Sequence, residues 1–354
     1  MELPLEEANA AAINNAIDTF FTHSIKQASE VDPSYQQLWV SLHQLICHGG
    51  KRLRPRMVLL AYDAFGGQEL DTIIPVAVAQ ELLHFCLLIH DDVIDRDYVR
   101  YGTANIAGSY KAIYSEFVKT QEDLTHYAHS AAILGGDLML SAAYQMILTS
   151  ELTADEKMTA QSFLNQGIFD VAGGELLDTE LGFMPLVDGK AIKVARYKTA
   201  GYSFLSPLMT GAVLAGASTA QIEALRTYAT CLGIAYQLVD DLLGVFGDAT
   251  VIGKSTSSDI TEGKKTYMVE QAFSVMTNEQ KVAFEKWFGN INATEEGVAA
   301  VKALIESTGA KQATHDMVTK YANDARKAVG DMGLDTENDD KFIRLIQMVT
   351  ERAF

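Results

Sequence analysis

Two pairs of adjacent aspartates are the residues of this chain best suited to chemistry. The first pair lies within Leu87 to Asp95, LLIHDDVID, and the second within Tyr236 to Gly244, YQLVDDLLG. Each follows an apolar helical stripe, so carboxylates gather near the end of a buried helix, where like charges are costly unless a cation neutralises them. Because clustered hard oxygen donors suit Mg2+ together with phosphate and water oxygens, the pairs predict a metal–diphosphate site.

Helical spacing orients the first group of carboxylates. Residues four apart share a helix face, so Asp91 and Asp95 point the same way, while Asp92 is turned about 100° aside. Two parallel carboxylates can bridge a pair of magnesium ions that also hold a diphosphate. The alternative interpretation is an exposed acidic helix end without a ligand.

A compact basic turn provides matching cations. The run Gly49 to Pro55, GGKRLRP, places Lys51, Arg52 and Arg54 on a turn that opens a helix. Glycines expose backbone amides, a helix N-terminus carries partial positive charge, and Lys and Arg supply charge-assisted donors. The turn therefore predicts a phosphate site, against the alternative of a solvated basic turn.

Further cations and polar groups alternate with the carboxylates along the chain. Gln237 stands three residues before Asp240 and on the same helical face. Each such residue alone is more often a surface residue, but their order suits two anionic substrates and shared metal. The other members of this set are Arg100, Lys198 with Thr199, Lys254, and Lys264 with Lys265.

Helices must position these residues, and helical periodicity runs almost from end to end. No stretch alternates with period two and no Gly/Ser/Pro linker divides the chain, so we expect an all-α fold with one domain over residues 1–354 and no sheet. The least regular segments are 102–125, an expected insertion or lid, and 247–266. We expect helices at 6–29, 35–48, 54–65, 70–96, 127–149, 155–181, 188–199, 202–216, 219–246, 260–275, 278–287, 294–308, 310–330 and 337–352.

Composition and charge narrow the classes of function. The 354 residues carry a formal net charge of -18, which argues against nucleic acid and against an anionic membrane surface. The three cysteines, Cys47, Cys86 and Cys231, are sparse and unpatterned, as in a reduced cytoplasmic protein. The acidic N-terminus lacks the basic region of a signal peptide, and no uninterrupted apolar run reaches the roughly 18 residues of a membrane span. We therefore expect a cytoplasmic protein with no integral membrane segment.

Taken in order, these motifs resemble those of the trans-isoprenyl diphosphate synthases, the polyprenyl synthetase family that includes geranylgeranyl and farnesyl diphosphate synthases. HDDVID resembles the first aspartate-rich motif and QLVDD the second, while GGKRLRP, Lys198–Thr199 and Gly253–Lys254 match other family motifs in the same order. Residues 173–178 resemble a family segment on a central helix. The resemblance covers nearly the whole chain and implies a single helical bundle of the isoprenoid synthase type around a deep central cavity.

The resemblance assigns roles to the candidate residues. It implies that Asp91 and Asp95 ligate two Mg2+ ions and Asp240 a third, with Asp92 and Asp241 in support. The residues implied for the allylic diphosphate are Arg100, Lys198, Thr199, Gln237 and Lys254, with Lys264 nearby, and those implied for isopentenyl diphosphate are Lys51, Arg54 and His84.

The implied reaction is ionisation, condensation and elimination. Metals and cations stabilise the departing diphosphate while the allylic carbon–oxygen bond breaks to give a carbocation. Dipoles of Thr199, Gln237 and the backbone near Lys198 stabilise this cation, the isopentenyl double bond attacks it, and the released diphosphate removes the proton. Arg100 completes the expected catalytic set, and the resemblance also implies a homodimer.

Two positions depart from the family pattern. The family usually has paired arginines after the first motif, the second of which helps to bind isopentenyl diphosphate, whereas here Tyr101 follows Arg100. A phenol offers one neutral donor in place of five charged ones, so we expect a homoallylic site weakened by about 1.5–3 kcal/mol unless Lys111 or another insertion residue compensates. The second motif ends in Gly244 where many relatives have a third aspartate, which removes one supporting carboxylate.

Product length in this family depends on what blocks a hydrophobic tunnel beneath the first motif. Leu87 and Cys86 stand four and five positions before Asp91, and neither is a bulky aromatic residue. We therefore expect a product of twenty carbons or more.

Two other functions stay open. A class I terpene cyclase shares aspartate-rich helices and Mg2+, but it has no second diphosphate for the GGKRLRP turn to bind. A catalytically weak subunit of a heteromeric synthase would account for Tyr101, but both metal motifs are largely intact.

Overall fold

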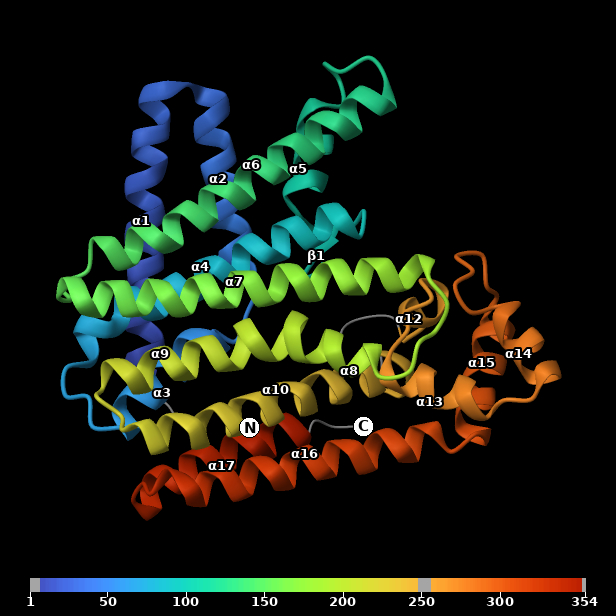
Figure 1. Cartoon of the computed structure of the whole chain (residues 1–354). Helices are drawn as coiled ribbons and strands as arrows, with labels where there is room; N and C mark the ends of the chain where they lie inside the picture. Colours follow the sequence, from blue (N-terminus) through green and yellow to red (C-terminus); the bar gives the residue numbers. More distant parts are fainter. Residues whose placement is uncertain (1–6, 248–255, 352–354) are drawn as a thin grey trace. The chain divides into compact units, whose positions relative to one another are not determined.

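The computed structural model describes residues 7–247 and 256–351, and helices dominate it (Figure 1). The prediction of an all-α fold is confirmed. A small hairpin is the exception: β1 (Val99–Arg100) pairs antiparallel with β2 (Thr103–Ala104). The expectation of no sheet is wrong at this point because strands of two residues are too short to show an alternating pattern.

The chain divides into two compact units. Of the described residues, 7–164 and 210–216 form the N-terminal unit, and 165–209, 217–247 and 256–351 form the C-terminal unit. The prediction of one domain over residues 1–354, with an insertion or lid at 102–125, stays a prediction.

The N-terminal unit is organised around α4 (Leu70–Ile94), which packs against α3 (Leu53–Ala64) and α6 (Gln121–Leu148). Because α4 is apolar on nearly every side, its side chains are buried around most of its circumference. The first aspartates stand at the C-terminal end of this helix. The remaining elements are α1 (Glu7–Val31), α2 (Pro33–His48), α5 (Ile106–Tyr114), the start of α7 (Ala154–Phe183) and the end of α9 (Ser206–Leu214).

The segment 102–125 is more regular than expected. It contains α5, and α6 begins at Gln121 rather than at residue 127. Side-chain caps explain both starts: Asn105 accepts from the backbone nitrogen of Gly108 at 2.8 Å, and Thr120 accepts from that of Asp123 at 3.0 Å. Polar and aromatic residues hid this helix, because they weaken the apolar periodicity on which the prediction depends.

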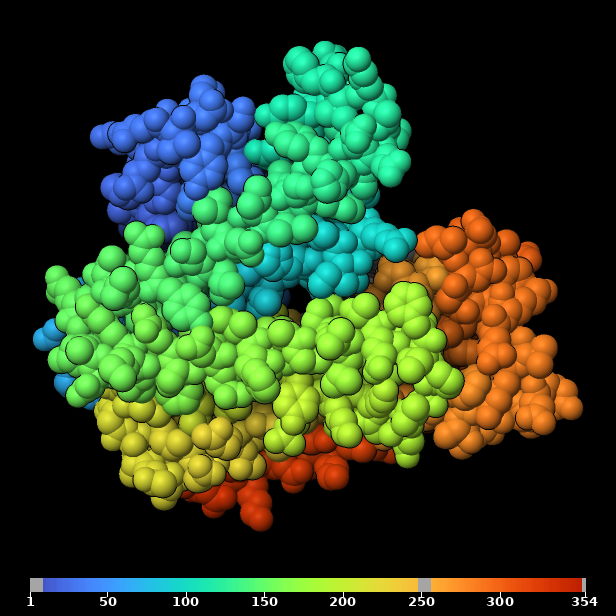
Figure 2. All heavy atoms as spheres, turned by 45° about the horizontal axis from the view of Figure 1, so that its top comes forward, coloured from blue at the N-terminus to red at the C-terminus, as the bar shows by residue number. Residues whose placement is uncertain are grey.

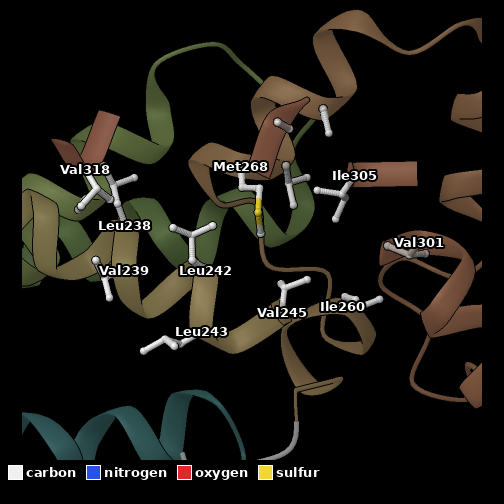
Figure 3. Close-up of a cluster of buried hydrophobic side chains, with 14 of the residues drawn as sticks. Leu238, Val239, Leu242, Leu243, Val245, Ile260, Met268, Val301, Ile305 and Val318 are labelled. Atoms are coloured by element: carbon white, nitrogen blue, oxygen red, sulfur yellow. The ribbon is translucent and has the colours of Figure 1, made fainter. Parts of the chain in front are cut away.

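The C-terminal unit is organised around α10 (Thr219–Phe246), which packs against η1 (Ala195–Leu205) and α16 (Ala310–Met332). Figure 3 shows Leu238, Leu242 and Val245 of α10 in a buried cluster with Met268 and Ile305. This cluster fixes the end of α10 that carries the second aspartates. The other described elements are the rest of α7 and α9, α8 (Lys190–Val194), α12 (Ser258–Thr261), α13 (Tyr267–Val275), α14 (Asn278–Glu285), α15 (Glu295–Ser307) and α17 (Thr336–Thr350).

By length and composition alone, three helices of the described chain could cross a membrane: Leu70–Ile94, Gln121–Leu148 and Thr219–Phe246. Within the protein, 72%, 44% and 56% of their most apolar 18-residue windows are buried. The prediction that the protein has no integral membrane segment stays a prediction.

Candidate functional site

In the N-terminal unit, the β1–β2 hairpin folds Arg100 back onto the first aspartates. Arg100 donates to Oδ1 of Asp92 from Nη2 at 2.6 Å and from Nε at 2.9 Å, and its Nη2 lies 3.6 Å from Oδ2 of Asp91. Asp92 is buried and Asp91 is half-buried, whereas Asp95, the C-cap residue of α4, is exposed. The structure therefore separates an inward carboxylate held by arginine from two more accessible ones.

Electrostatics supports this division of roles. Burial raises the pKa of Asp92, and the hydrogen bonds and charge of Arg100 partly offset that rise. Burial lowers the pKa of Arg100, but Asp92 and Asp91 raise it overall. With Asp92 engaged by arginine, Asp91 and Asp95 present hard oxygen donors, which are the ligands that Mg2+ takes in proteins. The residues present fit magnesium.

Arg52 anchors the basic turn to α4. It is the N-cap residue of α3 with φ +49°, and it donates to Oε1 of Glu81 at 2.9 Å and to the carbonyl oxygen of Ile46 at 2.8 Å. Glu81 is only 3% exposed, and breaking a buried ion pair by removing one partner typically costs about 3–5 kcal/mol. Glu81 was not among the predicted site residues, although a lone glutamate in an apolar stripe, three residues before His84, was an available signal.

Lys51 and Tyr101 line one pocket of the N-terminal unit, together with Arg52 and Arg56. The pocket has a volume of about 820 Å³. Tyr101 lies with its ring against Gly49, where a Cβ atom would overlap the ring. The phenol therefore stands beside the basic turn, at the position where the family resemblance implied a second arginine.

Arg54 and His84 lie close to the same group of cations but are not among the residues that line this pocket. Burial, followed by the charges of Arg54, Arg100 and Arg52, lowers the pKa of His84 well below 6.5. His84 is therefore a neutral imidazole at physiological pH and would act as a hydrogen-bonding group rather than as a cation.

In the C-terminal unit, a π-helix carries Lys198 and Thr199. The sequence predicted two helices at 188–199 and 202–216, but η1 runs through the predicted break. Thr199 donates from Oγ1 to Oε1 of Gln237 at 2.6 Å, and Gln237 donates from Nε2 to Oδ1 of Asp241 at 2.8 Å. This hydrogen-bonded chain links η1 to the second aspartate pair, and π-helical segments within helices are frequent at functional sites.

Two carboxylates of α7 hold Lys198. Its Nζ lies 2.9 Å from Oε2 of Glu175 and 2.6 Å from Oδ2 of Asp178. Gly174 permits the close approach of α7, because a Cβ atom there would overlap the backbone nitrogen of Lys198. Residues 173–178 were predicted by resemblance to lie on a central helix, but no role was predicted for Glu175 or Asp178.

Asp259 adds a third carboxylate to the second aspartate pair. Burial raises the pKa of Asp241 well above its usual range, and the charges of Asp240 and Asp259 add to the rise against the hydrogen bond from Gln237. A Cβ atom at Gly244 would lie 3.0 Å from Cγ of Asp259 and would overlap its Oδ2. Asp259 therefore fills the space beside Gly244, where the resemblance left a third aspartate missing.

Lys264 supports this carboxylate. Its Nζ lies 3.2 Å from Oδ1 of Asp259 and 3.2 Å from Oε2 of Glu262. Burial lowers the pKa of Lys264, but these two acids raise it overall. Asp240 is exposed. Like the first cluster, the second therefore combines an accessible carboxylate with a carboxylate that a cation holds, here Asp259.

Three predicted site residues take no part in the contacts of the two aspartate clusters that the structure describes. Lys254 lies outside the described residues. Cys86 is buried with its Sγ 3.8 Å from Nδ1 of His90, and burial raises its pKa to about 12. Leu87 is half-buried. The roles of Cys86 and Leu87 in product length stay predictions.

Comparison with known proteins gives the family. The polyprenyl synthetase family model matches residues 36–306. A geranylgeranyl diphosphate synthase from Sulfolobus acidocaldarius is 28% identical over 345 residues, which cover 95% of this chain and 98% of the relative. One from Methanosarcina mazei is 33% identical and covers 77% of this chain and 76% of its own length.

A solved structure agrees with these relatives. The geranylgeranyl pyrophosphate synthase from Corynebacterium glutamicum, complexed with isoprenyl diphosphate and magnesium, matches with a TM-score of 0.90 and 28% identity. The match covers 96% of this chain and 97% of the solved chain. The all-helical fold, the ordered motifs and these matches lead to one conclusion: the chain belongs to the polyprenyl synthetase family.

Proposed function

We propose that this prenyltransferase condenses isopentenyl diphosphate with an allylic diphosphate in a magnesium-dependent reaction, making an all-trans polyprenyl diphosphate of twenty carbons or more. The observation that carries the proposal is the pair of aspartate clusters, each with a cation bound to one of its carboxylates: Arg100 on the buried Asp92 and Lys264 on the half-buried Asp259. A geranylfarnesyl diphosphate synthase from Aeropyrum pernix, 30% identical over 88% of this chain, supports the proposed product length.

In the N-terminal unit, Asp91 and Asp95 would ligate two Mg2+ ions. Arg100 holds Asp92 and lies 3.6 Å from Asp91, so it would both orient the cluster and contact the allylic diphosphate. Isopentenyl diphosphate would bind through its anionic head to Lys51 and Arg54, with His84 as a neutral hydrogen-bonding partner.

In the C-terminal unit, Asp240 would ligate a third ion, and Asp241 would support it. When bound, Mg2+ neutralises the charge that develops on the diphosphate as its bond to carbon breaks. The residues of this unit proposed to bind the allylic diphosphate are Lys198, Thr199, Gln237 and Lys264, and Lys254, outside the described residues, is proposed to join them.

The remaining steps need no protein nucleophile. The allylic carbon–oxygen bond breaks and its electron pair leaves with the diphosphate. The isopentenyl double bond then forms the new carbon–carbon bond, and the departing diphosphate takes the proton that is lost. The hydroxyl group of Thr199 donates its hydrogen bond to Gln237. The lone pairs of the hydroxyl oxygen therefore remain available to stabilise the carbocation.

The setting of the enzyme is part of the same proposal. We propose a cytoplasmic homodimer whose partners are the two diphosphate substrates. The family resemblance implies the homodimer, and the formal net charge of -18 argues against a nucleic-acid partner.

Product analysis tests the proposal. Purified protein would receive labelled isopentenyl diphosphate with dimethylallyl, geranyl or farnesyl diphosphate, with and without Mg2+, and the dephosphorylated products would be sized. Discrete polyprenols that require Mg2+ support the synthase. Metal-dependent loss of the allylic substrate without elongation would indicate a terpene cyclase, and no turnover of either kind would indicate a catalytically weak subunit.

A further inference from the structure

We infer that Asp18, His43 and Cys47 form a binding site for a zinc-class divalent cation, separate from the aspartate clusters. The three side chains come from α1 and α2 of the N-terminal unit, and one ligand atom of each lies within 4.8 Å of the other two. Nε2 of His43 is 2.9 Å from Oδ1 of Asp18, and Sγ of Cys47 is 3.9 Å from the same oxygen.

The donor set selects the metal. An imidazole nitrogen, a thiolate and a carboxylate are all zinc ligands, whereas Mg2+ prefers oxygen donors alone. Zinc bonds of about 2.0–2.3 Å in a tetrahedron place ligand atoms about 3.3–3.8 Å apart, and the observed separations bracket that range. The side chains of Asp18 and His43 are 57% and 28% exposed, so solvent can reach the fourth position.

Rigid elements hold the ligands in place. His43 and Cys47 are four residues apart on α2 and therefore share a face. The His43 ring stacks on Phe21 of α1 with centroids 5.0 Å apart and planes at 14°, and Phe21 is fully buried. Figures 1 and 2 show the blue segments α1 and α2 packed side by side. Ligands on packed helices lose little conformational freedom when a metal binds.

The Cys47 side chain is a protonated thiol that donates towards Oδ1 of Asp18. Burial and the negative charge of Asp18 raise the pKa of Cys47, while Arg52 lowers it in part. A bound cation would favour the thiolate and release a proton.

A metal ion at this position would cross-link α1 to the C-terminal end of α2. Cys47 stands two residues before Gly49, where the basic turn begins, and both Asp18 and Cys47 line the pocket that contains Lys51 and Arg52. This cross-link would therefore hold α1 against α2, the helix that precedes the basic turn.

Cobalt titration of the full-length protein tests the inference, with Mg2+ in excess to occupy all-oxygen sites. We expect one equivalent of Co2+ to produce a thiolate-to-cobalt charge-transfer absorption that Zn2+ abolishes by displacement. Cys47→Ser should remove this absorption, whereas Cys231→Ser should retain it. Asp18→Asn and His43→Gln should weaken Co2+ binding by at least about tenfold, and the exposed His126→Gln should not.

The opposite results would overturn the site. The absence of a charge-transfer band in the wild type, or its persistence in Cys47→Ser, would show that these residues do not bind the metal. The three side chains would then form only an ion pair next to a thiol. Circular dichroism checks that each variant is folded. If Cys47→Ser does not fold, the Co2+ affinity of Asp18→Asn, a substitution at an exposed side chain, tests the site instead. None of these measurements depends on prenyl transfer, so the inference and the proposed function stand or fall separately.

Discussion

The carboxylate of Asp259 lies in the space that a side chain on residue 244 would need. A Cβ atom at Gly244 would overlap Oδ2 of Asp259 and lie 3.0 Å from its Cγ. The glycine that ends the second aspartate motif therefore does not leave that motif one carboxylate short. Asp259, held by Lys264 at 3.2 Å, provides a third acidic side chain from another helix.

This relationship predicts that Gly244→Ala is destabilising. The added methyl group forces Asp259 or α10 to move, and such overpacking costs about 1–3 kcal/mol of unfolding free energy. Urea unfolding measures the change. Gly330→Ala is the matched control, because Gly330 lies in α16 with no atom within 4 Å of the added Cβ. That control should stabilise the protein by about 0.5–1 kcal/mol. Equal effects of the two substitutions would contradict the steric account.

Tyr101→Arg should strengthen the site for isopentenyl diphosphate. Tyr101 lies against Gly49 beside the basic turn, so an arginine there adds a charged donor where the native protein has a neutral one. We expect the KM for isopentenyl diphosphate to fall by about tenfold or more, in line with one charge-assisted hydrogen bond. Steady-state kinetics measures it, with Phe117→Arg as a control that adds the same charge at a residue 76% exposed. If Tyr101→Arg leaves the KM for isopentenyl diphosphate unchanged, the tyrosine does not weaken the binding of this substrate.

His84 should make the protein less stable in acid. Its pKa in the folded state lies well below 6.5, mainly because of burial. The unfolded chain therefore binds more protons below pH 6.5, and the unfolding free energy falls as the pH decreases from 6.5 towards the folded pKa. His84→Gln should remove this part of the pH dependence, and His126→Gln should keep it. Urea unfolding across that pH range checks the expectation, and identical slopes in the wild type and His84→Gln would contradict it.

Cys86→Phe should shorten the product. Cys86 is 2% exposed on α4, five residues before Asp91, and a phenyl ring there would narrow the tunnel that the family resemblance implies. We expect the main product to lose at least one five-carbon unit. Chromatography of the dephosphorylated products measures this, and circular dichroism confirms that the variant is folded. An unchanged product length would show that Cys86 does not face the growing chain.

Much of the fold could be predicted from the sequence because its long helices have strong apolar periodicity. For α10 the predicted and observed bounds coincide at 219–246, and α4 ends within two residues of its prediction. The π-helix was missed because its period differs from 3.6 residues, so the apolar pattern breaks between residues 199 and 202. Periodicity thus locates elements well, but it divides the irregular helix that carries Lys198 and Thr199 into two.

The candidate site was predictable where its residues share one helix and not where they meet through the fold. The shared face of Asp91 and Asp95 follows from helical spacing. The same reasoning paired Gln237 with Asp240, whereas in the structure Gln237 donates to Asp241, four residues further on. The position of Asp259 does not follow from spacing, because it reaches Gly244 from a separate helix and no spacing rule connects the two positions. Likewise, the pairing of Lys198 with Glu175 and Asp178 joins η1 to α7, and only the three-dimensional structure reveals it.

The most direct test of the central claim is the rate of magnesium-dependent condensation in two aspartate variants, one from each cluster. We expect Asp91→Ala and Asp240→Ala each to lower kcat by about 10²-fold or more, because each removes a ligand for the metal that stabilises the leaving diphosphate. The exposed Asp316→Ala should keep the wild-type rate. Condensation at the wild-type rate in either cluster variant would contradict the claim that each aspartate cluster takes part in the magnesium-dependent reaction.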